Sequence, residues 1–529
     1  MSAGGISIDE QEVGSMGKVR TYFKNAVILT VTGLALRAAG MFFRIYIAAR
    51  IGAEGMGLYQ LIFTIYSLCI TFATAGVSVA ATRLAAEELT QPDMGRTAGV
   101  LNRVVRLGLE LGLAAAVVQF VLAYPAAKYW LGDARAELSL KILAPSLPFM
   151  AVGTALRGYF FARRQVGPNS WSQIWEQVVR IALVMVLMPR VLDWGIQYAC
   201  AAVVIGNTVS EILSCLLMVW YYKKDSKSLY GGARPYLPAG TTGRMWHIVA
   251  PVEGGRCLDS ALRTVENILV PACLLVFLGS REESLAQFGA LKGMAMPILL
   301  FPFSFLNPLA TLLLPEITEA HILGHKKTLE TLVGRIMLFT NMFSVLAGGL
   351  IALNAGPLAR LLYHDESIAF YLLVLGPVLP GMYLDSMGDA VLKGLGEEVA
   401  TFRYSIWDST LRIALVILLL PRTGMKGFLF VMLVSNISSA LLNIFRISKV
   451  ADIRTRWYRW FLQPTLLFGV SALAGQLAVR FSSAEGDIPV LLISCAVTGG
   501  LFCLLLLRCG LGDIIRSMLS AQKKTAGAA

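Results

Sequence analysis

The sequence predicts an all-α integral membrane protein with 14 transmembrane helices, arranged as two parallel-repeat six-helix lobes plus two C-terminal helices. Three observations lead to this fold class. The 529 residues are 56% hydrophobic and 15% charged, with a mean hydropathy of +0.66, a composition typical of a membrane protein and not of a soluble one. Apolar runs long enough to cross a bilayer recur along the chain. The two halves of the chain also match each other in sequence.

Fourteen apolar runs are the predicted helices. A crossing takes about 20 residues, and the backbone inside lipid must satisfy its own hydrogen bonds. None of the runs shows the alternation of a membrane β-strand. The first run, from Ala26, is too long for a cleavable signal and is expected to remain. In order, the runs span residues 26–49, 58–81, 107–127, 142–162, 174–192, 196–221, 246–277, 285–314, 332–353, 368–391, 405–420, 427–445, 462–479 and 489–507.

The net charge of +13 would suggest nucleic-acid binding in a soluble protein, so the positions of the 46 Lys and Arg residues decide its meaning. With the N-terminus placed in the cytoplasm, 28 of them fall in inner segments, ten in outer loops and eight within helices or at their edges. The positive-inside rule then predicts that both termini are cytoplasmic. We expect no nucleic-acid partner.

An internal repeat relates the two halves. At an offset of 232 residues, helices 4 and 5 match helices 10 and 11, and residues 180–184 and 412–416 share the letters RIALV. Because each unit holds six helices, both units run in the same direction, which is the arrangement that places a substrate cavity between two rocking lobes. Further matched positions are Glu176 with Asp408, Arg37 and Arg44 with Arg256 and Arg263, and the Asn-x-x-Ser-x-x-Leu motif at Asn207 with that at Asn436.

The repeat sets the expected domain boundaries. We predict a cytoplasmic N-terminus at 1–24, an N-lobe of helices 1–6 at 25–222, a cytoplasmic linker at 223–244, a C-lobe of helices 7–12 at 245–446, helices 13 and 14 at 447–510, and a cytoplasmic tail at 511–529. The linker holds Lys223-Lys224, Gly231-Gly232 and Pro235, which are residues typical of a connection.

Charged residues inside the apolar runs are the candidate functional residues, because each costs about 2.5–3.5 kcal/mol near the bilayer centre unless it is paired or faces water. Glu176 and Arg180 are spaced i,i+4, and Asp408 and Arg412 repeat that spacing, so both are predicted structural ion pairs. Helix 7 carries five charges along one broad face, which fits a self-neutralising ladder and a cavity lining equally well. They are Glu253, Arg256, Asp259, Arg263 and Glu266.

The unbalanced cations predict an anionic substrate. Arg37 and Arg44 point the same way on helix 1, and no acidic residue lies between Ala26 and Arg50. Lys292 on helix 8 has no carboxylate between residues 284 and 315, although snorkelling to an interface could also explain it. Guanidinium groups in a dry cavity suit phosphate oxygens. The predicted ligands of a phosphate or diphosphate head group are Arg37, Arg44, Lys292, Arg256 and Arg263.

Four further carboxylates lie in apolar runs, and they are candidates for ion coupling. Asp385 and Asp389 are one turn apart on helix 10 and could hold a proton or a sodium ion. Glu110 on helix 3 and Glu211 on helix 6 are the other two. Pairing with the arginines above is an equally good interpretation.

No motif indicates an enzyme. The chain has no nucleotide-binding G-x-x-x-x-G-K-[ST], no HExxH and no arrangement of a catalytic triad. We predict no catalytic residue, no metal site, and no cofactor beyond a coupling Na⁺ or H⁺. Residues 52–57, GAEGMG, are expected to form a tight turn, and His321 and His325 a solvated helix end.

Several segments resemble the stage V sporulation protein B family and related polysaccharide flippases of the multidrug/oligosaccharidyl-lipid/polysaccharide exporter superfamily. They are Arg37-x-x-Gly40, residues 49–59 (ARIGAEGMGLY) and residues 75–80 (AGVSVA). The resemblance implies a bacterial plasma-membrane flippase that exports an undecaprenyl-pyrophosphate-linked saccharide by alternating access, in sporulation or cell-wall synthesis. It also implies a groove for the lipid tail at helices 13 and 14.

The lipid II flippases of this superfamily carry an arginine pair on helix 1, which Arg37 and Arg44 match in kind with a spacing that differs by one residue. They also carry a basic residue five positions before a helix 8 proline, as Lys292 and Pro297 do here. Residues 67–80 of helix 2 lack the arginine found in those flippases. That departure argues against lipid II itself and leaves the broader class of lipid-linked saccharides.

Two other functions remain open at this point. A cation-coupled multidrug exporter would share the architecture and prefer an acidic cavity. A membrane scaffold for cell-wall or spore-cortex assembly would need no transport of its own. The expected partners are a lipid-linked saccharide and membrane lipid, with cell-wall synthesis proteins as further candidates.

Overall fold

The computed structural model describes residues 8–90, 93–230, 234–452, 456–482 and 486–509, and within these ranges every regular element is a helix. The first half holds α1 Ile8–Glu88, α2 Met94–Pro125, α3 Ala136–Leu143, α4 Ser146–Ala162, α5 Val166–Val191 and α6 Ile196–Tyr230. The second half holds α7 Thr241–Leu278, α8 Arg281–Phe288, α9 Met296–Leu300, α10 Asn307–Ile322, α11 Lys326–Leu353, α12 Ala355–Tyr363, α13 Ser367–Leu375, α14 Leu379–Gly394, α15 Glu398–Thr423 and α16 Met425–Val450. The last two are α17 Gln463–Phe481 and α18 Asp487–Arg508.

The protein is an all-helical, multi-pass membrane protein. In the described part of the chain, 11 helices are long and apolar enough to cross a membrane, or up to 12 when the bent pair α3 and α4 is taken as one crossing. That number is below the 14 predicted. One reason is α5, which carries Glu176 and Arg180 and is not among the 11. The other is α1, which the prediction divided into two helices.

The long α1 contains a break. Its apolar part, Thr30–Glu88, has 59 residues and would measure about 90 Å as one straight helix, three times the thickness of the hydrocarbon core. Gly52 has φ 68° and ψ −176°, a conformation that ends a helix and that glycine adopts without strain. The tight turn predicted at residues 52–57 is therefore a bend at Gly52, after which the helix resumes at once.

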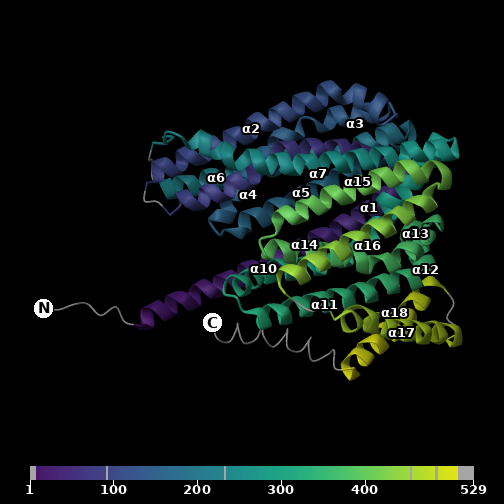
Figure 1. Cartoon of the computed structure of the whole chain (residues 1–529). Helices are drawn as coiled ribbons and strands as arrows, with labels where there is room; N and C mark the ends of the chain where they lie inside the picture. The colour runs from purple at the N-terminus through teal and green to yellow at the C-terminus, as the bar shows by residue number, and fades with distance from the viewer. Residues whose placement is uncertain (1–7, 91–92, 231–233, 453–455, 483–485, 510–529) are drawn as a thin grey trace.

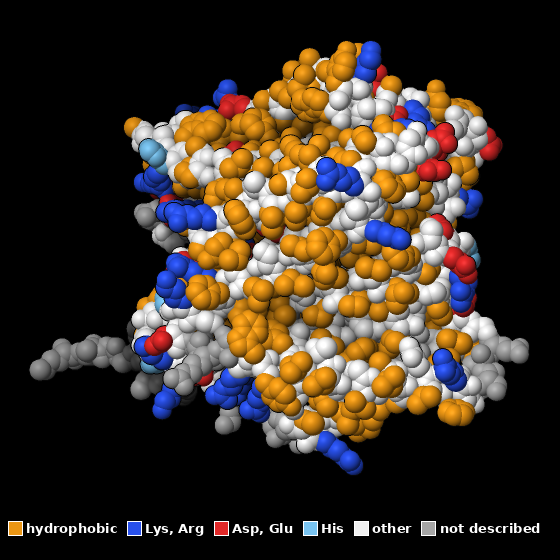
Figure 2. Space-filling model, turned by 45° about the vertical axis from the view of Figure 1, so that its right-hand side comes forward, with side chains coloured by type: hydrophobic (Ala, Val, Ile, Leu, Met, Phe, Trp, Pro, Cys, Tyr) orange, Lys and Arg blue, Asp and Glu red, His pale blue; other side chains and the backbone are white. Residues whose placement is uncertain are grey.

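The outside of the bundle is apolar, as lipid contact requires. Figure 2 shows one broad, mostly hydrophobic face, on which most charged side chains lie toward the left and right edges and a few Lys or Arg side chains lie between them. Large side chains that are exposed on the bundle surface include Phe120, Leu473 and Phe481. Because buried and lipid-facing surfaces are both apolar, composition alone cannot tell the two apart.

The helix α7 lies between the two halves of the molecule. It packs against α1 on one side and along α15 on the other (Figure 1). Its first turns join a hydrophobic cluster of the first half, in which Met245 and Val249 contact Val77 and Leu84. The pair α17 and α18 lies at the edge of the second half, against α11 and α12 (Figure 1).

The predicted linker, 223–244, is largely helical where it is described. Residues 223–230 continue α6, and α7 begins at Thr241. We call the end of the bundle that carries this connection and the α1–α2 connection the linker end. The opposite end, where α1 bends at Gly52 and α7 meets α8, is called the hairpin end.

Candidate functional site

A charge network joins α4, α5 and α6 inside the first half. Arg180 Nη2 lies 2.6 Å from Glu176 Oε1 and 3.6 Å from Glu211 Oε1. Arg157 of α4 approaches Glu176 at 3.8 Å. All four side chains are at most 21% exposed, so they compensate one another in a place where an isolated charge would be costly. The structure thus contains the intrahelical pair Glu176–Arg180 and extends it to Glu211.

A cavity of about 240 Å³ opens beside this network, among α1, α5 and α6. Arg44 and Arg180 both line it, from α1 and α5. Both charges are near enough to Tyr59 to interact with it electrostatically, so the two guanidiniums face a common space. Two cations on one cavity favour an anionic occupant.

Arg44 lies where the two halves meet. Its charge also reaches Tyr363 of α12 in the second half, whose hydroxyl donates to the carbonyl oxygen of Met294 at 3.1 Å. In the ranges that the structure describes, Arg44 itself takes part in no hydrogen bond or ion pair. Arg37, two turns earlier on α1, is exposed as well. The Arg44 guanidinium, exposed at the junction of the halves, is therefore available to a ligand.

The second half has a matching network around Arg412. Its Nη1 lies 3.3 Å from Glu266 Oε1 of α7, and its Nε lies 3.2 Å from Asp408 Oδ2. The same Nε donates to Ser435 Oγ of α16 at 2.6 Å, and the Ser435 hydroxyl donates to Asp408. This arginine is therefore enclosed by two carboxylates and a hydroxyl.

The other predicted cationic ligands lie in different surroundings. Lys292 lies in a π-helical turn, Gly289–Ala295, with its Nζ 5.6 Å from the Phe428 ring centroid. It is within electrostatic range of Glu266, Arg412 and Arg263, so it belongs to the network of the second half and does not line the Arg44 cavity. Its counter-charge comes from α7, which the sequence of helix 8 alone could not reveal. Arg263 pairs with Asp259 at 3.0 Å, and Arg256 is exposed.

The four candidate coupling carboxylates have different surroundings. Glu110 is exposed and pairs with Arg103 and Arg106 at 3.2 Å each. Asp389 pairs with Lys393 at 2.5 Å. Asp385 accepts a hydrogen bond from Asn443 Nδ2 at 2.9 Å and feels the charges of Asp408 and Arg412. Glu211 belongs to the Arg180 network. The structure therefore places Asp385 and Glu211, one in each half, beside a repeat-related arginine.

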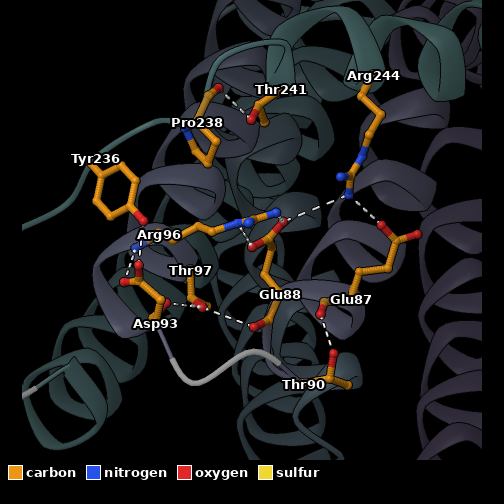
Figure 3. Close-up of polar contacts among 10 residues, drawn as sticks. All are labelled: Glu87, Glu88, Thr90, Asp93, Arg96, Thr97, Tyr236, Pro238, Thr241 and Arg244. Atoms are coloured by element: carbon orange, nitrogen blue, oxygen red, sulfur yellow. Dashed lines mark hydrogen bonds and ion pairs between the residues drawn. The ribbon is translucent and has the colours of Figure 1, made fainter.

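At the linker end, the connection between the halves is held against the first half (Figure 3). Arg244 Nη2 lies 2.5 Å from Glu87 Oε2, and Arg96 Nε donates to Glu88 Oε2 at 2.7 Å. The Tyr236 hydroxyl donates to Asp93, which caps α2 by accepting from the Arg96 backbone N–H. The hydrogen bond from Tyr236 lowers the pKa of the Asp93 carboxyl and raises the pKa of the Tyr236 phenol.

Backbone packing strengthens this attachment. The Tyr236 N–H donates to the Gly95 carbonyl oxygen at 3.2 Å. A Cβ atom on Gly99 would approach the Tyr236 carbonyl oxygen to 1.9 Å, so only glycine allows the strand-like segment to lie there. Residues 234–241 therefore form a strap that ties the start of α7 to α1 and α2.

At the hairpin end, the halves meet backbone to backbone. A Cβ atom on Gly57 of α1 would approach the Leu285 carbonyl oxygen to 2.1 Å, and one on Gly289 would approach the Ala53 carbonyl oxygen to 2.0 Å. Arg281 of α8 donates to the Leu131 carbonyl oxygen of the first half. These contacts close the hairpin end.

Sequence patterns missed three amides of the cavity: Gln60 on α1, Gln177 on α5 and Asn207 on α6. Uncharged polar residues do not stand out in an apolar run, and Asn207 was noticed only as part of the repeat. The histidines His321 and His325 lie at the α10–α11 connection, and no group of three metal-ligating side chains occurs among the described residues. The site has the character of a binding site for a ligand with anionic and polar parts.

Comparison with known proteins agrees with this fold. The chain is 26% identical over 483 residues to stage V sporulation protein B of Bacillus subtilis (strain 168), covering 88% of this chain and 91% of that protein. It is 21% identical over 507 residues to the lipid II flippase MurJ of the same organism, covering 86% and 87%.

Solved structures match over most of the chain. A lipid II flippase MurJ structure in an inward closed conformation gives a TM-score of 0.69 at 15% identity, covering 92% of this chain and all of that one. An inward-facing multidrug resistance transporter of the MATE family gives 0.66 at 15% identity, covering 80% and 99%. At this identity the likeness shows the fold alone.

The family model described as "Polysaccharide biosynthesis protein" matches residues 22–321, which is more than half of the chain. Together with the relatives above, this match makes the protein a transporter and not an enzyme. The chain belongs to the polysaccharide biosynthesis protein family of the multidrug/oligosaccharidyl-lipid/polysaccharide exporter superfamily.

Proposed function

We propose that the protein exports a lipid-linked saccharide, carried on a polyprenyl diphosphate, across the cytoplasmic membrane of a bacterium by alternating access. The observation that carries the proposal is Arg44, a guanidinium at the junction of the halves with no hydrogen bond or ion pair among the described residues. It shares a cavity with Arg180. The oxygens of a diphosphate are suited to bidentate binding by such guanidinium groups. A cavity for cationic drugs would instead present carboxylates.

The topology that goes with this function has 14 crossings. Counting α1 as two crossings and adding α5 and the bent pair α3 and α4 gives that number. The linker end then faces the cytoplasm, where the positive-inside rule puts it. The units 25–222 and 245–446 act as the two lobes that rock, joined by residues 223–244, while α17 and α18 stand outside them.

The closed hairpin end suits a state that receives substrate from the cytoplasm. In that state the diphosphate binds Arg44 first, with Arg37, Arg256, Arg263 and Lys292 supplying positive potential along its path. Asp385, and Glu211 in the first half, are the carboxylates best placed to couple transport to H⁺ or Na⁺. A saccharide for the cell wall or the spore cortex is the expected cargo.

The test uses the full-length protein reconstituted in vesicles that contain fluorescent undecaprenyl-diphosphate-linked saccharide. Arg44→Ala should reduce translocation to the background of empty vesicles, because the head group loses its main charge partner. Arg422→Ala, an exposed arginine in the last turn of α15, should transport like wild type. Wild-type transport by Arg44→Ala would refute the assignment. Transport of cationic dyes but not of the saccharide would favour a drug exporter, and no transport under any ion gradient would favour a scaffold.

A further inference from the structure

The cavity beside Arg44 is lined by two kinds of side chain that sugars need. Three aromatic rings line it: Phe43, Tyr59 and Phe63. Three amides face it from three different helices: Gln60, Gln177 and Asn207. Aromatic walls with a few placed polar groups are typical of specific small-molecule sites. Each amide offers a donor and an acceptor, which is what a pair of neighbouring hydroxyls requires.

Two donors that belong to residues lining this cavity have no partner in the described part of the chain. The Nε2 atom of Gln60 and the Nε atom of Arg180 are both buried, and neither makes a hydrogen bond within the described residues. Buried polar atoms are nearly always satisfied, so each such exception calls for a ligand or an ordered water. Both side chains line the same cavity, which makes one occupant the simplest explanation for the two.

The second half of the repeat shows that the missing partner at Arg180 is a specific feature. Arg412, at the matching position, donates from its Nε to Ser435. Aligning Asn207 with Asn436 places Gly206 where Ser435 stands. The first half therefore lacks the hydroxyl that would satisfy Arg180.

Packing explains why that position is glycine. A Cβ atom on Gly206 would lie 2.5 Å from Val184 Cγ2 and 3.3 Å from the Arg180 carbonyl oxygen. At 2.5 Å, either the Val184 side chain or one of the two helices would have to move. The packing of α5 against α6 thus disfavours a side chain at this position, and Arg180 Nε is left without a hydroxyl partner among the described residues.

The size of the cavity limits its occupant. Its 240 Å³ equals the volume of about eight liquid waters and is below the roughly 300–1,000 Å³ of sites for drug-sized ligands. This space is of the size of one sugar ring. Arg44, which lines the same cavity and lies at the junction of the halves, is placed to bind a phosphate attached to that ring.

We infer that this cavity is a subsite for the first sugar of the substrate, the ring bonded directly to the diphosphate, with Gln60, Gln177, Asn207 and Arg180 Nε binding its hydroxyl or amide oxygens. The inference rests on the proposed function and adds to it the residues that select the sugar. Sites that hydrogen-bond a ligand group discriminate strongly against ligands that lack it, because the buried donors are then left unpaired.

The experiment compares two ligands on the detergent-purified, full-length protein. One is undecaprenyl diphosphate, which has no sugar, and the other is undecaprenyl diphosphate linked to one N-acetylhexosamine. Gln60→Met removes an amide at nearly constant volume, and Arg180→Lys keeps the charge but removes Nε. Each should weaken binding of the sugar-bearing lipid about tenfold and leave binding of the plain diphosphate unchanged.

The control is Arg412→Lys, the same change at the repeat-related position. It should not weaken binding of the sugar-bearing lipid more than binding of the plain diphosphate. The thermal stability of each variant shows whether it is folded. If a variant is not folded, Asn207→Leu is used in its place. The subsite is refuted if the variants bind both lipids like wild type, or lose both equally. If the wild type binds neither lipid, the proposed function is refuted together with the subsite. Failure of the subsite alone is therefore distinguishable from failure of the proposed function.

Discussion

Arg180 and Arg412 occupy matching positions in the two halves of the molecule, but their surroundings differ. Each lies near two carboxylates, Glu176 and Glu211 in the first case and Asp408 and Glu266 in the second. The second carboxylate comes from α6 in the first half and from α7 in the second. The two arginine side chains are equally exposed, at 21% each. Ser435 accepts a hydrogen bond from Arg412 Nε, whereas Arg180 Nε has no partner among the described residues and its side chain lines a cavity. The two halves thus differ in whether this nitrogen is satisfied within the protein.

The largest expected effect on stability comes from replacing Arg412. Arg412→Leu would leave Asp408 and the 4%-exposed Glu266 without their main counter-charge. We expect a loss of about 3–5 kcal/mol of stability, seen as a lower melting temperature in detergent. Arg422→Leu is the exposed control and should melt like wild type. An unchanged melting temperature for Arg412→Leu would show that the network is not structural.

The next prediction tests the contribution of the Ser435 hydroxyl alone. Ser435→Ala would remove the hydroxyl that links Arg412 Nε to Asp408. We expect the free energy of unfolding to fall by about 1–3 kcal/mol, without the cost of placing a glycine in a helix. Ser448→Ala, on the same helix, serves as the control. Equal destabilisation by both would remove the special role of Ser435.

The effect of the reverse exchange is measured as a change in binding. Gly206→Ser combined with Val184→Ala supplies a hydroxyl to Arg180 and makes room for its Cβ atom. This pair should weaken binding of the sugar-bearing lipid about tenfold, because Arg180 Nε would be occupied. The Val184→Ala variant alone should bind the sugar-bearing lipid with an affinity closer to that of the wild type. Unchanged affinity in the double variant would contradict the subsite.

The smallest effect concerns the linker end, where the halves also differ. Asp93 caps α2 and holds Tyr236, whereas His325, the residue before α11, makes no side-chain cap. The depressed pKa of Asp93 means that its contribution is present above the usual carboxyl range near pH 4 and is lost as the pH falls through the lowered value. Tyr236→Phe should therefore lower the melting temperature slightly at pH 7 and by nothing once Asp93 is protonated. A difference that persists in acid would exclude this carboxyl as its source.

Much of the fold could be predicted from the sequence because lipid enforces one rule on every helix. The repeat and the helical class followed from composition and from matched residues such as Arg180 and Arg412. The number of crossings is harder to read from helix length and composition, because α1 continues past Gly52 as one helix and the charges of α5 make it less apolar than its neighbours. The sequence prediction counted these segments as three separate helices.

The candidate site was only partly predictable. Arg44 stood out because no acid lies near it in sequence. The counter-charge of Lys292 could not be found this way, because Glu266 approaches from another helix. The unpartnered donor of Arg180 depends on how closely α5 and α6 pack. One signal was available: extending the Asn-x-x-Ser match back by one residue pairs Gly206 with Ser435.

The bend at Gly52 has a consequence for how the protein is made. The helical segments before and after this residue are joined by no loop, so neither can be released into the membrane and oriented independently of the other. They would enter the bilayer together as a hairpin. An epitope or glycan acceptor inserted at this bend would therefore interfere with biogenesis before it could report topology.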